Sequence, residues 1–339
     1  MIDLLVAGAG PVGLFAAITA AEAGLKVSII EPHLGVIDKA CGEGLMPAAL
    51  ANLASIGINP AGIDFYGIRY LSGAKQAEAR FSHGPGRGVR RTILQGALLE
   101  RAKELGVTLI EGKVKEIIES ASSLKVEGVE TRYLIAADGL HSSIRYQMGA
   151  HLENKKQSSP RYGLRQHFVV APWSNFVEVY WLPDCEIYIT PVDVERVGVA
   201  ILGRATLNFQ SIILKVPELS ERLAGAAAAS KLLGAGPLLQ QVKKRVIGRV
   251  LLVGDAAGYV DALTGEGLSV GFAEAKAAVQ ALLQNDPKRY EKEWQKITRS
   301  YRRLAGGLLW ASSNRALRPL IVPAAQTMPS LFRTLISKH

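Results

Sequence analysis

After Met1 the chain reads Ile2-Asp3-Leu4-Leu5-Val6-Ala7-Gly8-Ala9-Gly10-Pro11-Val12-Gly13-Leu14-Phe15-Ala16-Ala17-Ile18, and this stretch decides the fold. Its apolar start has the length of a β-strand, the glycines mark a turn, and the small residues after them predict a helix. Gly8 allows a tight reversal, Gly10 lets the backbone approach a pyrophosphate, and Gly13 lets the helix pack closely on the strand. The unpaired N–H groups at the helix start would face the phosphates. The stretch therefore predicts a dinucleotide-binding turn.

An acidic residue supports this interpretation. The apolar run at residues 27–30 predicts the second strand, and it ends at Glu31, about twenty residues after the glycines. A carboxylate at this place can accept hydrogen bonds from a ribose diol, which favours FAD or NAD over NADP. The alternative is an ordinary buried strand and turn. A strand before the glycines, a helix after them and an acid downstream together favour the dinucleotide site.

The composition is that of a globular protein. The 339 residues are 48% hydrophobic and 21% charged, and this length suggests two domains. No apolar run is long enough to span a membrane, and a glycine turn follows the first strand where a signal peptide would have a cleavage site, so we expect a cytoplasmic protein. The two cysteines, Cys41 and Cys185, lie far apart and lack metal-ligand spacing, so neither a disulfide framework nor a metal site is expected.

The formal net charge is +10, and most of the excess lies near the end of the chain. Residues 286–339 contain 11 Lys and Arg against 3 Asp and Glu, a net charge of +8. Nucleic acid is not the expected partner, because the segment has no recognisable nucleic-acid-binding module. An anionic substrate or a peripheral contact with the inner face of the membrane stays open. Apolar residues at helical spacing form a stripe here, which we expect to pack on the body of the protein rather than enter a membrane: Met328, Leu331, Phe332, Leu335 and Ile336.

Two further features lie between the second strand and the middle of the chain. Cys41-Gly42-Glu43-Gly44 predicts a sharply turning loop that passes close to a cofactor ring, with a plain connecting loop and a buried thiol as the alternative. Arg91 opens a predicted helix, where a cationic side chain either meets the cofactor or is only solvated.

Two later strands also end in turns of nucleotide type. The run at residues 132–137 leads to Asp138-Gly139, and the run at residues 249–253 leads to Gly254-Asp255. Thr264-Gly265-Glu266-Gly267-Leu268 then precedes a helix of small residues, whose N–H groups and positive dipole end would stabilise negative charge on a reduced ring. A plain strand-to-helix connection is the alternative for the first of these turns.

From residue 161 to residue 202 the pattern changes to four short apolar runs separated by turn residues. They predict an antiparallel sheet inserted into a βαβ protein, and its aromatic residues either line a substrate cavity or pack on a helix: Phe168, Tyr180, Trp181 and Tyr188. The fold class is α/β with an α+β insert, namely a Rossmann-like cofactor domain, an interleaved antiparallel-sheet substrate domain and C-terminal helices. We expect the cofactor domain at residues 1–70, 88–155 and 245–285, the substrate domain at residues 71–87 and 156–244, and a basic helical segment at residues 286–339.

These segments together resemble the FAD-dependent oxidoreductase superfamily of para-hydroxybenzoate hydroxylase and geranylgeranyl reductase type, related to the group A flavin monooxygenases. The resemblance implies FAD in an extended form, with its adenosine ribose on Glu31, its ribityl and phosphate region at Arg91 and Asp255, and its isoalloxazine against the loop before residue 269. It also implies NAD(P)H as a transient reductant, since the chain has no second complete glycine fingerprint. The cofactor-binding residues expected from it are Gly8, Gly10, Pro11, Val12, Gly13, Glu31, Cys41, Gly42, Arg91, Asp138, Gly139, Gly254, Asp255, Thr264, Gly265, Glu266, Gly267 and Leu268.

The resemblance leaves the reaction open. The first interpretation is an NAD(P)H-dependent monooxygenase that uses molecular oxygen and a flavin C4a-hydroperoxide to hydroxylate an aromatic, polyketide or quinone-like small molecule. The alternative is a reductase of isoprenoid double bonds, because residues 41–44 and 261–267 look like those of geranylgeranyl reductases, with Cys41 as the candidate catalytic residue. A third hypothesis is a flavin-binding partner protein without turnover.

Overall fold

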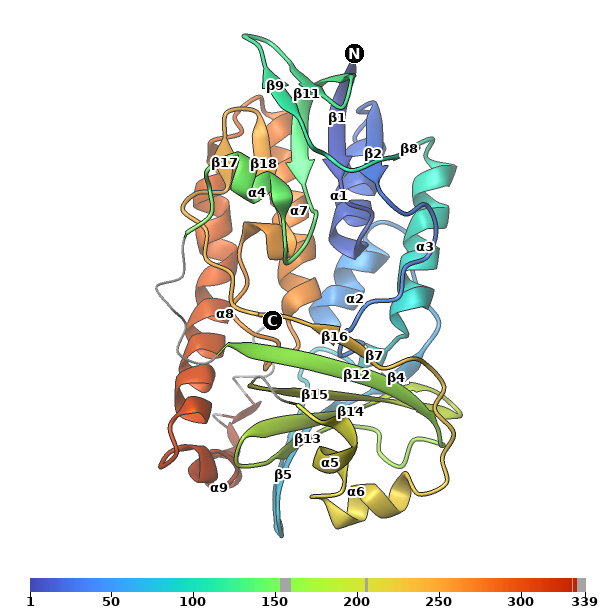
Figure 1. Cartoon of the computed structure of the whole chain (residues 1–339), viewed down its shortest axis with the longest axis vertical. Helices are drawn as coiled ribbons and strands as arrows, with labels where there is room; N and C mark the ends of the chain where they lie inside the picture. Colours follow the sequence, from blue (N-terminus) through green and yellow to red (C-terminus); the bar gives the residue numbers. More distant parts are fainter. Residues whose placement is uncertain (153–159, 205–206, 331, 334–339) are drawn as a thin grey trace.

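The computed structural model describes residues 1–152, 160–204, 207–330 and 332–333. Two large sheets lie towards opposite ends of the molecule, and helix α8 runs along one side from the first sheet to the second (Figure 1). The class expected from the sequence is confirmed, because parallel strands with helices and a separate, mainly antiparallel sheet occur in one chain.

The first sheet contains the glycine turn. Its main path runs β17-β18-β11-β1-β2-β8, and the five strands from β18 to β8 pair in parallel, while β9 and β10 form an antiparallel extension of β11. Neighbouring parallel strands need a long crossover connection, usually a helix, and the intervening segments supply such helices. The strands are β1 (Ile2–Ala7), β2 (Val27–Glu31), β8 (Thr108–Glu111), β9 (Ile117–Glu119), β10 (Leu124–Val126), β11 (Val129–Ala136), β17 (Val246–Ile247) and β18 (Val250–Leu252).

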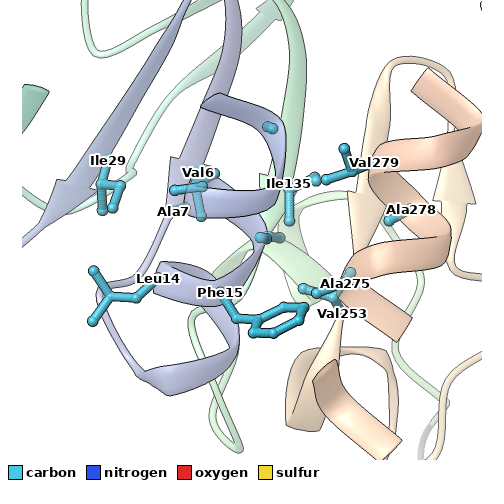
Figure 2. Close-up of a cluster of buried hydrophobic side chains, with 14 of the residues drawn as sticks. Val6, Ala7, Leu14, Phe15, Ile29, Ile135, Val253, Ala275, Ala278 and Val279 are labelled. Carbon is cyan, nitrogen blue, oxygen red and sulfur yellow. The ribbon is translucent and has the colours of Figure 1, made fainter. Parts of the chain in front are cut away.

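Small side chains allow the helices of this part to pack closely. Helix α1 (Pro11–Glu22) carries mostly alanine and other apolar residues, and it contacts α3 (Arg91–Glu104) and α7 (Gly267–Leu283). Figure 2 shows the cluster where Phe15 of α1 approaches α7, and its ring stacks on Phe272 with 4.7 Å between centroids. A side chain at Gly271 would come within 2.6 Å of Val12, so the contact between the two helices requires glycine there.

The second sheet joins segments that are far apart in the sequence. Its order is β16-β12-β15-β14-β13-β5-β6, and the four predicted antiparallel strands are confirmed as β12 to β15. Strand β13 pairs in parallel with β5, which comes from the first quarter of the chain. The strands are β5 (Gly67–Ser72), β6 (Lys75–Arg80), β12 (Arg161–Val169), β13 (Val177–Trp181), β14 (Cys185–Asp193), β15 (Arg196–Arg204) and β16 (Leu233–Ala235).

The two faces of this sheet have different partners. Phe168 and Tyr180 lie in one core cluster with residues of α5 (Phe209–Ile213) and α6 (Pro217–Arg222), whereas Trp181 and Tyr188 belong to the other cluster. The hypothesis that all four aromatic residues line one cavity is therefore wrong for Phe168 and Tyr180. Neighbouring positions of a strand point to opposite faces, and the aromatic content alone does not distinguish the two faces.

A small third sheet connects the two large ones. It consists of β3 (Gly44–Leu45), β4 (Ile63–Phe65) and β7 (Gly86–Gly88), with α2 (Pro47–Ala54) after β3. A side chain at Gly88 would lie 1.6 Å from the carbonyl oxygen of Pro191 in β14, so backbone packs directly on backbone here. This contact places β7, which pairs with β3, directly against the second sheet.

The basic C-terminal segment packs back onto the body. It forms α8 (Arg289–Ser313), the 3-10 helix η2 (Arg318–Leu320) and α9 (Ile321–Thr327), and α9 contacts β5 and β6. The ring of Phe332 is buried 4.6 Å from that of Tyr70, which favours the packed interpretation for this part of the stripe, although residues 331 and 334–339 lie outside the described residues. Among the described residues, we find no helix with the length and apolarity that crossing a bilayer requires.

A buried ion network ties this segment to the second sheet. The carboxylate oxygens of Glu186 in β14 lie 2.6 Å from Nη2 of Arg161 and 2.7 Å from Nη2 of Arg318. Nε of Arg161 also lies 2.9 Å from the carboxylate of Asp261. Arg318 donates to the backbone carbonyl oxygens of Ser312 and Cys185 as well. The network therefore joins the C-terminal segment, the sheet and the loop that precedes α7.

Candidate functional site

The glycine turn leaves room where a pyrophosphate is expected. A Cβ added at Gly8, whose φ is +105°, would lie 2.5 Å from the carbonyl oxygen of Ala137, and one at Gly13 would lie 2.0 Å from that of Gly8. A Cβ at Gly10 would meet nothing within 4 Å. Within the described chain, α1 begins without a side-chain cap and without an acid in its first turn. Its first N–H groups and the open space at Gly10 therefore fit a phosphate group.

We expect Gly10→Val to lower the affinity for FAD at least about hundredfold. Valine is compatible with the backbone at Gly10 (φ −68°, ψ 168°), so the fold should persist, but its side chain fills the phosphate space. The loss of two hydrogen bonds to a charged group, about 1.5–3 kcal/mol each, gives this magnitude. The affinity is measured by titrating apoprotein with FAD and following flavin fluorescence. Gly306→Val in α8, where an added Cβ also meets nothing, is the matched control, and equal affinities for the two variants would contradict the assignment.

Glu31 lies where the ribose is expected. Its carboxylate accepts the N–H of Ala9 at 2.8 Å and that of His33 at 3.3 Å, so it is fixed beside the glycine turn. Each carboxylate oxygen has a second lone pair, which leaves acceptor capacity for hydroxyl groups. Gln95 of α3 donates to the Ala9 carbonyl at 2.7 Å and accepts the N–H of Ile37 at 2.9 Å. Sequence reasoning missed Gln95, because a glutamine within a helix carries no motif.

Arg91 and Asp255 face the same region from two elements. Arg91 begins α3, and its buried Nη1 has no hydrogen-bond partner among the described residues. Asp255 lies in the 3-10 helix η1 (Gly254–Ala257) directly after β18, where burial raises the pKa of its carboxyl and the charges of Arg91 and Lys39 oppose the rise. A buried donor without a partner and a partly buried carboxyl group suit the phosphate and hydroxyl groups of a cofactor.

Asp138 lies beside the glycine turn, as its position after β11 predicts. A Cβ at Gly8 would be 3.2 Å from the Asp138 Cα, and the Asp138 carboxylate accepts the N–H of Ile144 in α4 (Ser143–Gln147). Arg145 is fully buried and donates to the backbone carbonyl oxygens of Leu140 and Asp255. Arg145 therefore stabilises the turn, whereas Asp138 and Gly139 remain candidate cofactor residues.

The loop before α7 approaches the cysteine loop. A side chain at Gly265, whose φ is +69°, would lie 2.8 Å from the methyl group of Met46. Glu266 is buried, which raises its pKa to about 7, although a hydrogen bond from Thr264 opposes this rise. Gly267 then begins α7, so the positive end of that helix dipole lies at this loop.

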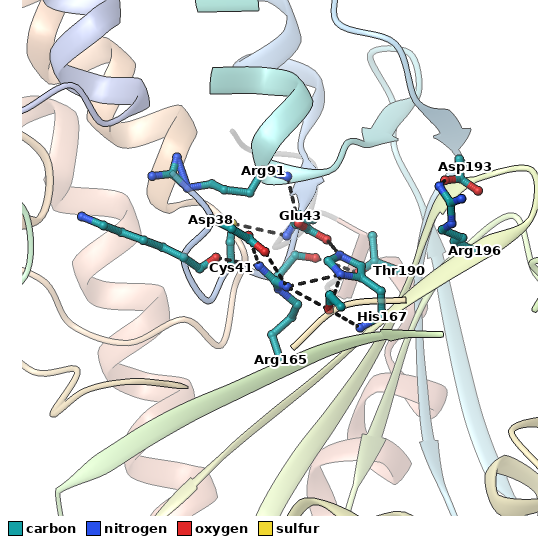
Figure 3. Close-up of polar contacts among 12 residues, drawn as sticks. Asp38, Cys41, Glu43, Arg91, Arg165, His167, Thr190, Asp193 and Arg196 are labelled. Atoms are coloured by element: carbon teal, nitrogen blue, oxygen red, sulfur yellow. Dashed lines mark hydrogen bonds and ion pairs between the residues drawn. The ribbon is translucent and has the colours of Figure 1, made fainter. Parts of the chain in front are cut away.

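The cysteine loop is held by strands of the second sheet (Figure 3). Thr190 donates to the carbonyl oxygen of Gly42 at 2.9 Å, and Arg165 pairs with Asp38. Half-buried Cys41 accepts the N–H of Glu43, with 3.4 Å between nitrogen and sulfur. The backbone around the thiol is thus fixed from several sides, as expected for a preorganised site.

Sequence reasoning missed three buried polar residues of β12, of which Arg165 and His167 hold this loop and Arg161 pairs with Asp261 in the loop before α7. Arg161, Arg165 and His167 recur at every second or fourth position of one strand and are buried. Polar residues on one face of an apolar strand are a signal that could have identified them.

The predicted residues meet at one edge of the first sheet. The glycine turn follows β1, Glu31 ends β2, Asp138 follows β11 and Asp255 follows β18. These are the carboxyl ends of parallel strands, where open α/β sheets bind ligands. The geometry supports an extended dinucleotide across this edge, with the cysteine loop beyond it.

The chain is similar in sequence to known reductases. No model of a known protein family matches the chain. It is 29% identical over 331 residues to digeranylgeranylglycerophospholipid reductase 1 of Methanopyrus kandleri, covering 86% of each chain. It is 28% identical over 318 residues to menaquinone reductase of Mycobacterium tuberculosis, covering 84% of this chain and 77% of that one.

Solved structures show the same fold. p-Nitrophenol 4-monooxygenase PnpA from Pseudomonas putida is similar with a TM-score of 0.81 and 16% identity, over 100% of this chain and 99% of that one. The halogenase PltM, in a complex with phloroglucinol and FAD, is similar with a TM-score of 0.78 and 15% identity, over 98% and 82% of the two chains. At these identities the likeness concerns the fold alone.

Proposed function

We propose that the chain is a member of the superfamily of FAD-dependent oxidoreductases that includes para-hydroxybenzoate hydroxylase and the geranylgeranyl reductases, and that it reduces carbon–carbon double bonds in the isoprenoid chain of a lipid. The observation that carries the proposal is the thiol of Cys41. It lies in a fixed loop beyond the cofactor edge, and burial followed by the charge of Glu43 raises its pKa. The names of the relatives, which are reductases of a geranylgeranyl lipid and of menaquinone, support the same chemistry.

The residues of the chain divide the work of such a reaction. Bound FAD supplies hydride chemistry. The start of α1 and Glu31 hold the dinucleotide, while Arg91 and Asp255 bind its central part. Cys41 keeps a proton on its sulfur and gives it to the carbon that does not receive hydride. A thiol that stays protonated at neutral pH suits this role better than that of a nucleophile.

The first experiment is anaerobic. Purified protein with FAD is reduced with NADH or NADPH and then mixed with a geranylgeranylated glycerophospholipid or with menaquinone. Mass spectrometry of the lipid should show the gain of one H₂ for each double bond reduced. Reduction of FAD without any change in these lipids would count against the proposal.

The monooxygenase interpretation stays a prediction, and an experiment in air with the same purified protein tests it. In air, a monooxygenase consumes oxygen in proportion to a hydroxylated product, whereas the proposed reductase needs no oxygen. Oxygen uptake coupled to hydroxylation of a phenol or quinone would favour the monooxygenase over the proposed reaction.

We also propose that the C-terminal helices contact an anionic lipid surface, since the substrate would be a lipid. Trp310, Leu320 and Met328 are 66%, 55% and 47% exposed, and the segment that carries them has a net charge of +8. Exposed apolar side chains among cationic ones are typical of interfacial helices. Charge complementarity with acidic headgroups adds to the apolar contact.

We expect the double variant Trp310→Ala/Leu320→Ala to bind anionic liposomes at least about tenfold more weakly. Burying one large apolar side chain contributes about 1.5–3 kcal/mol, and about 1.4 kcal/mol corresponds to a factor of ten. Co-sedimentation with vesicles containing phosphatidylglycerol measures the binding, which should also fall as salt increases. Val194→Ala, at an exposed apolar residue between β14 and β15, is the control. Unchanged co-sedimentation of the double variant with the vesicles would contradict the proposed lipid contact.

A further inference from the structure

Glu43 has an unusual backbone conformation for a residue with a side chain. Its φ is +60°, in the left-handed region that favours glycine, and the residue is only 4% exposed. Its N–H lies 3.4 Å from the sulfur of Cys41, and its carbonyl oxygen accepts the N–H of Val89 at 2.9 Å. Such a conformation persists only where the surrounding structure fixes it, and it is often found at functional sites.

The carboxylate of Glu43 connects two separate parts of the fold. One oxygen accepts the N–H of Arg91 at 2.8 Å, in the first turn of α3. The other lies 2.5 Å from Nε2 of His167 in β12, and Figure 3 shows both contacts. Gly198 of β15 lies beside this pair, since a Cβ there would be in ordinary contact with the carboxylate at 3.4 Å.

The hydrogen-bond partners of His167 indicate which of its ring nitrogens carries the proton. Its Nδ1 lies 3.2 Å from Nη1 of Arg165 and 2.9 Å from the hydroxyl of Ser230. Because a guanidinium only donates, we assign Nδ1 as an acceptor and place the ring proton on Nε2. Both oxygens of Glu43 then accept N–H groups, an arrangement that suits a carboxylate.

We propose that Glu43 and His167 form a positioning pair for Cys41, which fixes the cysteine loop between α3 and β12 and holds a negative charge beside the sulfur. The use of the thiol proton rests on the proposed function, whereas the geometry and charge of the pair do not. Positioning residues of this kind act through the group that they orient, and they do not touch the reacting atoms.

Charged and titratable groups from several elements face Cys41. Glu43 comes from its own loop, Arg91 from α3, Arg165 from β12 and the phenol of Tyr259 from the segment after η1. Burial and then Glu43 raise the pKa of the thiol, and the two arginines oppose the rise. Removing the charge of Glu43 should therefore lower the pKa of Cys41 and increase its thiolate fraction at a given pH.

The test measures the alkylation of Cys41 by iodoacetamide as a function of pH, with peptide mass spectrometry to identify the modified residue. In Glu43→Gln we expect the midpoint of the profile to fall by about one pH unit. At high pH the thiol is fully ionised and the alkylation rate reaches a plateau. In Glu43→Gln this plateau rate should change by less than the roughly tenfold change in thiolate fraction that one pH unit produces. A loop that had merely become looser would raise the plateau and leave the midpoint in place.

Two controls are available in the same chain. Glu178→Gln changes another buried glutamate of the second sheet, which pairs with Arg69 away from the cysteine loop, and should leave the Cys41 profile unchanged. Cys185 is buried in β14 and should remain unmodified in every folded variant. Alkylation of Cys185 therefore reports unfolding.

Variants of His167 test the pair independently, should Glu43→Gln fail to fold. His167→Ala removes the N–H donor and should raise the plateau rate, whereas His167→Gln keeps an N–H donor and should restore the wild-type profile. An unchanged midpoint in folded Glu43→Gln, or equal profiles for His167→Ala and His167→Gln, would overturn the proposal. The titration needs neither substrate nor reductant, so failure of the lipid reduction leaves its outcome intact.

Discussion

Replacing Cys41 by alanine should lower the turnover of lipid reduction by about 10²- to 10⁴-fold, the usual contribution of a positioned general acid. The loop is held through Gly42, Glu43 and Asp38, so it should keep its shape without the thiol. We therefore expect FAD affinity and the rate of FAD reduction by NAD(P)H to stay within about twofold of wild type. Stopped-flow reduction and steady-state turnover with the lipid separate these steps.

The matched control for this prediction is Cys185→Ala. Cys185 is the other free thiol, and its side chain lies in the cluster with α5 and α6 on the far face of the second sheet. Its replacement should cost stability only, without an effect on turnover. Full turnover in Cys41→Ala would show that the proton comes from elsewhere and would exclude Cys41 as the acid.

Glu186→Ala should lower the free energy of unfolding by about 3–5 kcal/mol, the usual cost of removing one partner from a buried ion pair. Glu186 is fully buried, and its two oxygens lie 2.6 Å from Arg161 and 2.7 Å from Arg318. Without it, two buried guanidinium groups lose their shared counterion. Denaturant unfolding followed by tryptophan fluorescence measures the effect.

An exposed glutamate provides the comparison. Glu218 pairs with Arg222 at 3.0 Å on the surface of α6, and such exposed pairs contribute about 0–1 kcal/mol. Glu218→Ala should therefore change stability far less than Glu186→Ala. If the two variants unfolded at the same denaturant concentration, the buried network would not stabilise the fold.

The cofactor edge could be predicted from the sequence because its signals are local. The spacing of Gly8, Gly10 and Gly13 after an apolar strand is typical of a dinucleotide-binding turn. Glu31 ends β2, and Asp138 and Asp255 come shortly after the ends of β11 and β18. Parallel strands then bring these residues to one edge. The pattern also predicted β12 to β15, since turn residues separate four apolar runs.

The contacts of the cysteine loop could not be predicted in the same way. Glu43 and His167 are 124 positions apart, and their contact depends on how the second sheet docks against the first. The net positive charge of the C-terminal segment favoured an anionic substrate or a membrane as its partner. Arg318 of this segment instead lies buried beside Glu186. A charge count gives the balance of a segment but not which of its members find a buried partner.

The interleaved strand order has a consequence for how the chain can fold during synthesis. Strand β5 gains its parallel neighbour β13 only about a hundred residues later, and β11 gains its neighbour β18 only after the whole second sheet has been translated. Contacts between residues far apart in the sequence slow folding, because the entropy of closing the long loop is lost before the contacts stabilise the chain. A nascent chain that stops between residues 235 and 250 contains every strand of the second sheet, but its first sheet still lacks β18. The first sheet should therefore be completed last, and a proteolytic fragment that ends near residue 235 would lack β17 and β18 of that sheet.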